Sequence, residues 1–346
     1  MNRIVTPLAA ALLAMPVTAQ EPAPSPNQIV EQANPEEWIA IPPEDLLVMT
    51  LAPTADGTPR QVVIQLMPAP FSQEWVENIR TLARTRWYDG VTVNRVQDNY
   101  VVQWGDPNYD NPEGDGEAKP LPEGLRTPSE SDYVAPANDS VLRGFANGVR
   151  VGAKRLLDQS DNGSFTKTPE PMRRFQSEVM RSDPYSIANI FRDGWPVSIS
   201  FGEEAKSVWP LHCYGMVGVG RGMSPDTGSG AELYTVIGHA PRHLDRNIAL
   251  VGRIVNGMEH LSSLPRGSGA LGFYTTEEAG KRTPILSIRV ATDLADSPGF
   301  KYLSTESETF ERYAEARANR RDPFFIVPAG GADICNIPVP VRRVVD

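Results

Sequence analysis

The stretch WYDGVTVNRVQDNYVVQWGDP, residues 87–107, is the most informative part of this chain. It contains two short runs of β-type residues, separated by turn residues at 97–99. Alternation with a period of two places Val91, Val93 and Arg95 on one face of the first run. The pattern predicts a β-hairpin that brings an arginine, an aromatic ring and an amide together on one sheet surface. No nucleophile accompanies them.

These residues resemble the signature of the cyclophilin-type peptidyl-prolyl isomerases. In that signature an arginine, an aromatic residue, a glutamine and a closing glycine-aspartate turn follow one another. Arg95, Tyr100 and Gln103 stand at the first three of these positions, and Gly105-Asp106 at the last.

A second block of the chain agrees with the same family. GMVGVGRG at 215–222, GSGAELYTVIG at 228–238 and RHLDRNIALVGRIVNG at 242–257 are similar to later strands of the family. The two blocks occur in the family's order. They indicate a cyclophilin-like domain with additions.

The resemblance implies a mainly β fold. We expect a closed, eight-stranded antiparallel barrel with two capping helices, filled by side chains, so that the site lies on its outer face. The barrel is expected over residues 44–295. A C-terminal extension follows at 296–346, with a charged helix around 305–321.

An insertion at 107–208 departs from the family, which has a much shorter connection there. Its first part is rich in Pro, Gly and acidic residues and is predicted to be a loop. Helices are predicted near 141–158 and 170–181. A lid, a partner surface or simple surface growth would each account for the insertion. Surface growth is favoured because long insertions cost little loop entropy.

The N-terminus has the pattern of a secretory signal peptide over residues 1–19. Arg3 precedes an apolar run from Leu8 to Met15, and small residues precede the cleavage point. The run is too short to span a bilayer. We therefore expect a periplasmic or secreted protein without stable membrane insertion after cleavage, and an uncleaved anchor is the alternative. Residues 20–43, rich in Pro, Glu, Gln and Ala, are predicted to be a flexible linker.

Charge and cysteine content restrict the partners. The 346-residue chain has a formal net charge of −10, which argues against nucleic acid as a main partner. Cys213 and Cys335 are able to form a disulfide in an exported chain, and two buried thiols are the alternative. No Cys or His spacing suggests a metal site, and no cofactor is expected. The sequence carries no signal for an oligomeric state.

Prolyl isomerisation needs neither acid, base nor nucleophile, because no bond is made or broken. Rotation about the amide costs roughly 18–20 kcal/mol, and the enzyme must bind the twisted amide better than either planar form. One charge-assisted hydrogen bond from a guanidinium contributes about 1.5–3 kcal/mol. An acceleration of about ten-thousandfold needs about 5.5 kcal/mol. The remainder must come from an apolar pocket for the proline ring and from a grip on the flanking backbone.

The resemblance implies a role for each matched residue. Arg95 is the expected catalytic arginine, and Gln103 the glutamine that binds the substrate backbone and helps to place the arginine. Nine further residues are expected to bind the substrate: Asn94, Tyr100, Val219, Gly220, Arg221, Glu232, Tyr234, His243 and Leu244. A plain core or surface role is the alternative for Arg95, Tyr100, Gln103, Tyr234 and Leu244.

Several positions differ from the family's pattern, among them Tyr100 for a phenylalanine, Val219 for a methionine and Ile248 for a histidine. Asn94 replaces a histidine, His243 replaces a tryptophan, and Glu232 replaces a glutamine and brings a negative charge toward Arg95. The leading prediction is a peptidyl-prolyl cis-trans isomerase that acts on proline-containing polypeptides and assists the folding of exported proteins. One alternative is a barrel that binds proline-containing segments with little or no turnover. The other is an envelope assembly factor that acts through the insertion and extension.

Overall fold

The computed structural model describes residues 23–109, 111–137, 186, 188–201, 206–327 and 331–344. The expected signal peptide and the helices expected near 141–158 and 170–181 lie outside these residues. Among the described residues, no helix is long and apolar enough to cross a membrane.

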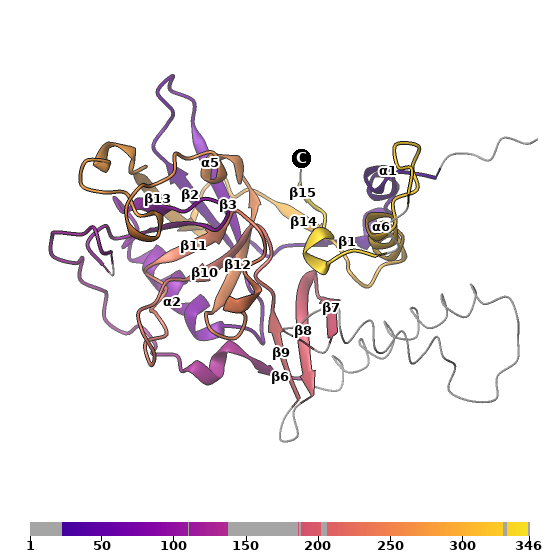
Figure 1. Ribbon diagram of the computed structural model, residues 1–346, viewed down its shortest axis with the longest axis horizontal. Helices are drawn as coiled ribbons and strands as arrows, with labels where there is room; N and C mark the ends of the chain where they lie inside the picture. Colours follow the sequence, from indigo (N-terminus) through magenta and orange to yellow (C-terminus); the bar gives the residue numbers. More distant parts are fainter. Residues whose placement is uncertain are drawn as a thin grey trace, which may run out of the picture.

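Eight antiparallel strands form one sheet that curls into a nearly closed barrel (Figure 1). At the seam, the Val93 N–H donates to the Thr283 carbonyl at 2.9 Å, and the Ile285 N–H donates to the Val91 carbonyl at 2.8 Å. The expected mainly β fold is confirmed. In hydrogen-bonded order the strands are β13 (Ile285–Val290), β2 (Leu46–Leu51), β3 (Arg60–Leu66), β12 (Leu250–Asn256), β10 (Met216–Val219), β11 (Leu233–Val236), β5 (Val101–Gly105) and β4 (Thr92–Val96).

Two helices pack against the barrel. The longer one, α2 (Gln73–Arg84), lies against β13 and β12. The single turn α5 (Glu259–Ser262) buries Leu261 and lies against β3. Apolar side chains at helical spacing face the barrel from α2, which is why this segment forms an amphipathic helix. They are Trp75, Val76, Ile79, Leu82 and Ala83.

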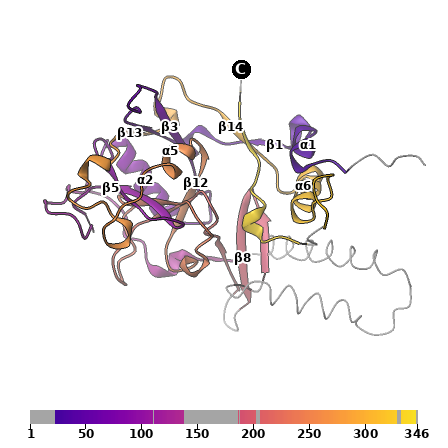
Figure 2. The ribbon, with the colours of Figure 1, turned by 45° about the horizontal axis from the view of Figure 1, so that its top comes forward.

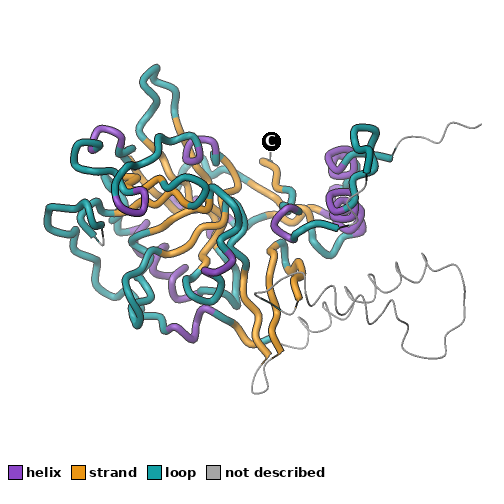
Figure 3. The backbone as a smooth tube through the Cα atoms, viewed as in Figure 1, coloured by secondary structure: helices purple, strands orange, loops and turns teal. Residues whose placement is uncertain are grey.

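Short segments of the insertion, with the two residues that follow it, form a four-stranded antiparallel sheet beside the barrel (Figure 3). Its order is β6 (Ala135–Pro136), β9 (Lys206–Pro210), β8 (Trp195–Phe201) and β7 (Ala188–Arg192). We call it the inserted sheet. Its apolar residues belong to the same hydrophobic core as the barrel, so this part of the insertion is packed onto the barrel rather than attached as a surface loop.

The two ends of the chain pack together. The strands β1 (Trp38–Ala40), β14 (Phe300–Leu303) and β15 (Val341–Arg343) form a three-stranded sheet. Next to it, α1 (Pro26–Glu31) lies beside α6 (Glu308–Ala318), which falls within the range expected for the charged helix (Figure 2).

Residues 26–40 are therefore not the flexible linker predicted for 20–43. Ile29 and Trp38 are buried in one cluster with Phe310 and Tyr313 of the C-terminal extension. Local composition is rich in Pro and Glu and therefore resembles a linker. Its few apolar side chains are buried by residues near the other end of the chain. The composition of residues 20–43 alone does not predict these contacts.

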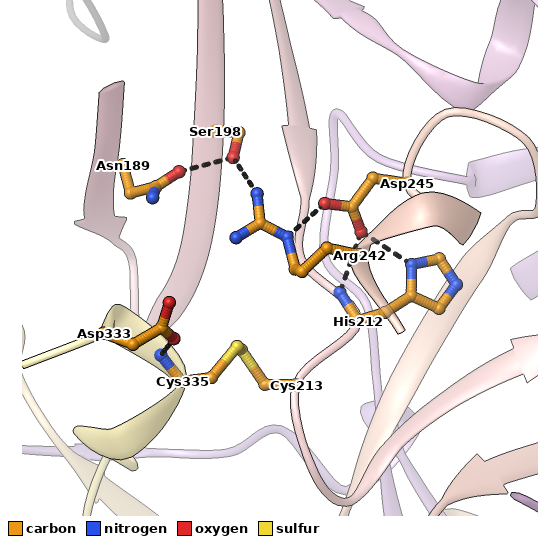
Figure 4. Close-up of a disulfide and its surroundings, with 8 residues drawn as sticks. All are labelled: Asn189, Ser198, His212, Cys213, Arg242, Asp245, Asp333 and Cys335. Atoms are coloured by element: carbon orange, nitrogen blue, oxygen red, sulfur yellow. Dashed lines mark hydrogen bonds and ion pairs between the residues drawn. A yellow bond between two sulfur atoms is a disulfide. The ribbon is translucent and has the colours of Figure 1, made fainter. Parts of the chain in front are cut away.

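The C-terminal extension is also joined covalently to the barrel. Cys213, in the turn before β10, forms a disulfide with Cys335 in the short helix Ile334–Asn336 (Figure 4). The two Cα atoms are 5.1 Å apart, and the cysteines are separated by 122 positions in the sequence. Of the two alternatives for the cysteines, the structure has the disulfide.

Candidate active site

Four neighbouring strands bring the candidate residues into one row on the outer face of the barrel. Arg95 on β4 lies opposite Gln103 on β5, which lies opposite Tyr234 on β11, which lies opposite Gly218 on β10. Directly opposite residues on antiparallel strands share a face and have Cβ atoms about 4.5–5.5 Å apart. Val102, next to Gln103, faces the core, so the row faces outward.

A β-bulge at Asn94 places Arg95 on this face. The pairing shifts between Val93, which lies opposite Trp104, and Arg95, which lies opposite Gln103. Strict alternation predicted one face for Val93 and Arg95, but Val93 is wholly buried in the core. The prediction is wrong because an extra residue in one strand of a pair reverses the alternation beyond it.

The Asn94 side chain stabilises the bulge. It is fully buried, and its Nδ2 donates to the Gly105 carbonyl at 3.1 Å. Its Oδ1 accepts a hydrogen bond from the Thr92 hydroxyl. The expectation that Asn94 contacts the substrate is therefore wrong for its side chain, whose two polar atoms are turned to neighbouring strand residues.

The guanidinium of Arg95 is held by three acceptors. Nε donates to the Leu271 carbonyl at 2.7 Å, and Nη1 donates to Oε1 of Gln103 at 3.2 Å. Nη2 donates to Oε1 of Gln97. These bonds fix the plane of the cation, and they place Gln103 where the family resemblance expects it, beside the arginine.

Aromatic rings flank the cation. The guanidinium carbon of Arg95 lies 5.6 Å from the centre of the Tyr100 ring and 5.4 Å from that of Phe273, within the range of cation–π attraction. Burial lowers the pKa of Arg95, whereas Tyr100 and Tyr234 act in the opposite direction. An arginine remains protonated despite such a shift, so the site presents a partly dehydrated positive charge.

A small apolar cluster, largely buried, lies next to Arg95 on the outer face of the barrel. The Tyr100 ring stacks on His243, with ring centres 6.2 Å apart and planes 7° apart. Leu244, the next residue, is half-buried. We call the apolar cluster here the outer patch, and its members are Tyr100, Val101, Tyr234, Val236 and Ile248.

Tyr234 is the buried wall of the outer patch, with an exposed fraction of 4 %. Its hydroxyl lies 2.9 Å from Nε2 of His212. Its ring lies over Gly218, where a Cβ would come within 2.8 Å of Cε1 and closer still to Cζ and the hydroxyl. Sequence reasoning missed both partners. The glycine has no distinguishing motif, and the histidine has no informative spacing.

Glu232 is turned toward β5. Its Oε1 accepts a hydrogen bond from the Asp106 N–H at 2.7 Å, and only 3 % of the residue is exposed. Its carboxylate fills the space above Gly105, where a Cβ would overlap it. Burial raises the pKa of Tyr88, and the negative charge of Glu232 adds to that rise. This placement puts a buried negative charge close to the strand that carries Gln103.

The residues at the end of β10 differ in their orientation. Val219 is wholly buried in the core, so the expectation that its side chain binds the substrate is wrong. The alternation that turns Gly218 outward turns Val219 inward. Gly220 is half-buried, and its N–H donates to the Glu232 carbonyl at 2.8 Å.

Arg221 joins two loops at the rim of the site. Its Nε and Nη2 donate to the Asn247 carbonyl at 3.0 and 2.8 Å, and its Nη1 donates to the Gly222 carbonyl at 2.8 Å. These bonds hold the loop after β10 against the segment that carries His243 and Leu244. Among the residues that the structure describes, no group of three or more His, Cys, Asp or Glu is arranged to hold a metal ion.

Most of the chain matches a known protein family. Residues 56–290 match the family described as cyclophilin type peptidyl-prolyl cis-trans isomerase/CLD. This chain belongs to that family. No curated protein matches it.

One solved cyclophilin structure has the same fold. Cyclophilin AquaCyp293 from Hirschia baltica is similar, with a TM-score of 0.57 and 20 % identity, over 91 % of this chain and 96 % of that one. A cyclophilin type peptidyl-prolyl cis-trans isomerase from Cryptosporidium parvum, studied in the presence of the dipeptide Ala-Pro, has a TM-score of 0.33 and 10 % identity, over 70 % of this chain and 98 % of its own.

Proposed function

We propose that this protein is an exported peptidyl-prolyl cis-trans isomerase that rotates Xaa-Pro bonds in other polypeptides and so assists their folding. The observation that carries the proposal is the row of Arg95, Gln103 and Tyr234 beside the outer patch. Family membership supports the reaction. The Cys213–Cys335 disulfide supports export, because disulfides persist mainly in oxidising compartments.

The row supplies what rotation of a prolyl amide requires. The proline ring lies on the outer patch, so that the amide nitrogen comes under the Arg95 guanidinium. As the amide twists, its nitrogen gains a lone pair, and a donor fixed there favours the twisted state over both planar states. Nε2 of Gln103 lies on the Gly220 side of the row, within 3.4 Å of the position of a Cβ there. From this side it donates to a substrate carbonyl and holds the backbone on one side of the bond.

Arg95 accounts for only part of the expected rate acceleration. A charge-assisted hydrogen bond from Arg95 contributes about 1.5–3 kcal/mol, a factor of about 10 to 150 in rate. Orientation of the proline ring and the flanking backbone must supply the rest. The bulge at Asn94 matters for this reason, because it alone gives Arg95 and Gln103 a common face.

The test compares Arg95→Ala with wild type in the isomerisation of a short Xaa-Pro peptide. We expect kcat/KM to fall about 10- to 150-fold, with little change in melting temperature. Arg84→Ala is the matched control, since this arginine is partly exposed on α2 and pairs with Glu44 and Asp293. Equal rates for Arg95→Ala and wild type would refute the role of Arg95.

One observation favours a second function, a proline-binding module with little turnover. Leu271, Gln103 and Gln97 already accept three of the five N–H groups of Arg95, so only one hydrogen on each Nη is left for a substrate. A wild-type protein that binds the peptide by calorimetry but does not accelerate its isomerisation would establish this alternative.

A further inference from the structure

A buried network of polar side chains runs from the inserted sheet toward the outer patch (Figure 4). The Ser198 hydroxyl on β8 donates to Oδ1 of Asn189 on β7 at 2.6 Å. The same hydroxyl accepts a hydrogen bond from Nη2 of Arg242 at 3.1 Å. Nε of Arg242 in turn donates to Oδ2 of Asp245. The first half of the network thus joins the inserted sheet to the loop that carries His243.

The second half ends on the wall of the outer patch. Oδ1 of Asp245 accepts from the His212 backbone N–H at 3.1 Å and lies 2.8 Å from Nδ1 of the same histidine. Nε2 of His212 lies 2.9 Å from the Tyr234 hydroxyl. We call the six residues the polar network. They are Asn189, Ser198, Arg242, Asp245, His212 and Tyr234.

The direction of each hydrogen bond follows from the chemistry of the groups. An ionised carboxylate only accepts, so Nδ1 of His212 carries the proton that it shares with Asp245, and Nε2 is left as an acceptor. The Tyr234 hydroxyl therefore donates to His212. Its ring, not its hydroxyl, is then the part that packs in the outer patch with Val101 and Val236, which makes this buried tyrosine an apolar wall. Burial lowers the pKa of His212, in keeping with a neutral ring.

The network is rigid because it is buried and its members bind one another. His212 is 1 % exposed, and Ser198, Arg242 and Asp245 are buried as well. A satisfied polar network in a medium of low dielectric constant holds one arrangement, since any rotation leaves a buried polar atom without a partner. A second attachment lies next to it: the disulfide of Cys213 fixes the backbone beside His212 (Figure 4).

We propose that His212 and Asp245 are positioning residues of the candidate active site, and that the inserted sheet, acting through Ser198 and Arg242, determines how well the outer patch fits a proline ring. This inference rests on the proposed function of the outer patch as the proline-binding surface. It makes the inserted sheet a part of the substrate specificity of this protein. Tyr234 connects the polar network to the candidate active site, because it belongs to the network and lies opposite Gln103 in the row of site residues.

The experiment measures the affinity for a tetrapeptide with Ala-Pro at its centre by calorimetry, together with kcat and KM for its isomerisation. Ser198→Ala breaks the network far from the outer patch, and Tyr234→Phe removes its last hydrogen bond. We expect each variant to raise Kd and KM about threefold to tenfold with kcat nearly unchanged, as loss of one hydrogen bond predicts. The double variant should be no weaker than Tyr234→Phe alone, because both changes break the same connection.

Ser200→Ala is the matched control on the same strand, and its Kd and KM should equal those of wild type. His212→Gln keeps a donor and an acceptor in the side chain and should retain affinity within about threefold of wild type, whereas His212→Leu should lose at least as much as Ser198→Ala. Melting temperatures and near-UV circular dichroism show that each variant is folded.

The outcomes separate the two proposals. Wild-type affinity in a folded Ser198→Ala protein, or additive losses in the double variant, would overturn the network proposal while leaving the isomerase intact. A wild-type protein that binds the peptide without turnover would overturn the isomerase proposal, and the network would still be tested by Kd. If wild type does not bind the peptide at all, both proposals fail.

Discussion

The close packing of Tyr234 over Gly218 makes a sharp test of the site. In Gly218→Ala, the new Cβ would lie within 2.8 Å of Cε1 of Tyr234 and closer to Cζ and the hydroxyl oxygen. Ordinary van der Waals contact is about 3.5–4.0 Å, so the ring must move by about 1 Å. It cannot do so freely, because its hydroxyl is bound to His212 at 2.9 Å.

The expected loss has a structural and a functional part. Overpacking costs about 1–3 kcal/mol, and a weakened hydrogen bond adds about 0.5–1.5 kcal/mol. The melting temperature should therefore fall by about 5–15 °C. A displacement of about 1 Å at a substrate-positioning group costs about a hundredfold in rate, so kcat/KM should fall by about that factor at a temperature where the variant is folded.

The assay is peptide isomerisation of all proteins at one temperature, about 15 °C below the midpoint of the least stable one, with thermal melting alongside. Gly280→Ala is the matched control, because a Cβ at Gly280 has no atom within 4 Å. A Gly218→Ala protein with the melting temperature and kcat/KM of wild type would refute the placement of Tyr234. A lowered melting temperature with unchanged kcat/KM would show that Tyr234 belongs to the fold and not to the site.

Three other predictions concern stability and charge. Cys335→Ser opens a disulfide that spans 122 positions, so the free energy of unfolding in urea should fall by about 3–5 kcal/mol; a loss below about 1 kcal/mol would mean that packing alone holds the extension. Glu232→Gln removes a buried negative charge close to the strand that carries Gln103 and should raise kcat/KM about fivefold, as a charge interaction of about 1 kcal/mol with the Arg95 cation predicts, and an unchanged or lower rate would contradict this. The hydrogen bond from Lys281 lowers the pKa of Glu278 from 4.5 to about 2. Its stabilisation is therefore present above pH 4.5 and lost as the pH falls toward 2, so Glu278→Gln should show a smaller fall in melting temperature over that range than wild type, and parallel curves would contradict the assignment.

The sequence was sufficient for the fold and for the grouping of Arg95, Tyr100 and Gln103 on one hairpin. The hairpin at 87–107 and the block from 215 to 257 carry a strand pattern that local alternation predicts, and a motif order that the family shares. The structure brings Arg95, Gln103 and Tyr100 together as that motif implies. Motif order succeeds here because strand pairing in a barrel places residues by register, and register follows from the order and length of the strands.

The local sequence pattern did not predict which way each strand side chain faces. A period of two predicts one face for Val93 and Arg95, whereas a single bulge residue, Asn94, separates them into core and surface. Asn94 and Val219 stand at positions that the motif assigns to the substrate, yet both side chains are buried. A motif records which residues are present, and the partner strand decides which way each side chain faces.

The local sequence likewise did not predict contacts between residues that lie far apart in the chain. Ile29 lies in a segment with the composition of a linker, but residues near the other end of the chain bury it. His212 has no informative spacing, and its role follows only from contact with Asp245 and Tyr234. The sequence alone specifies a cyclophilin barrel with an arginine, a tyrosine and a glutamine on one hairpin. Tertiary structure alone decides which face they share and what holds Tyr234, because burial and hydrogen bonding are made between residues that the chain keeps far apart.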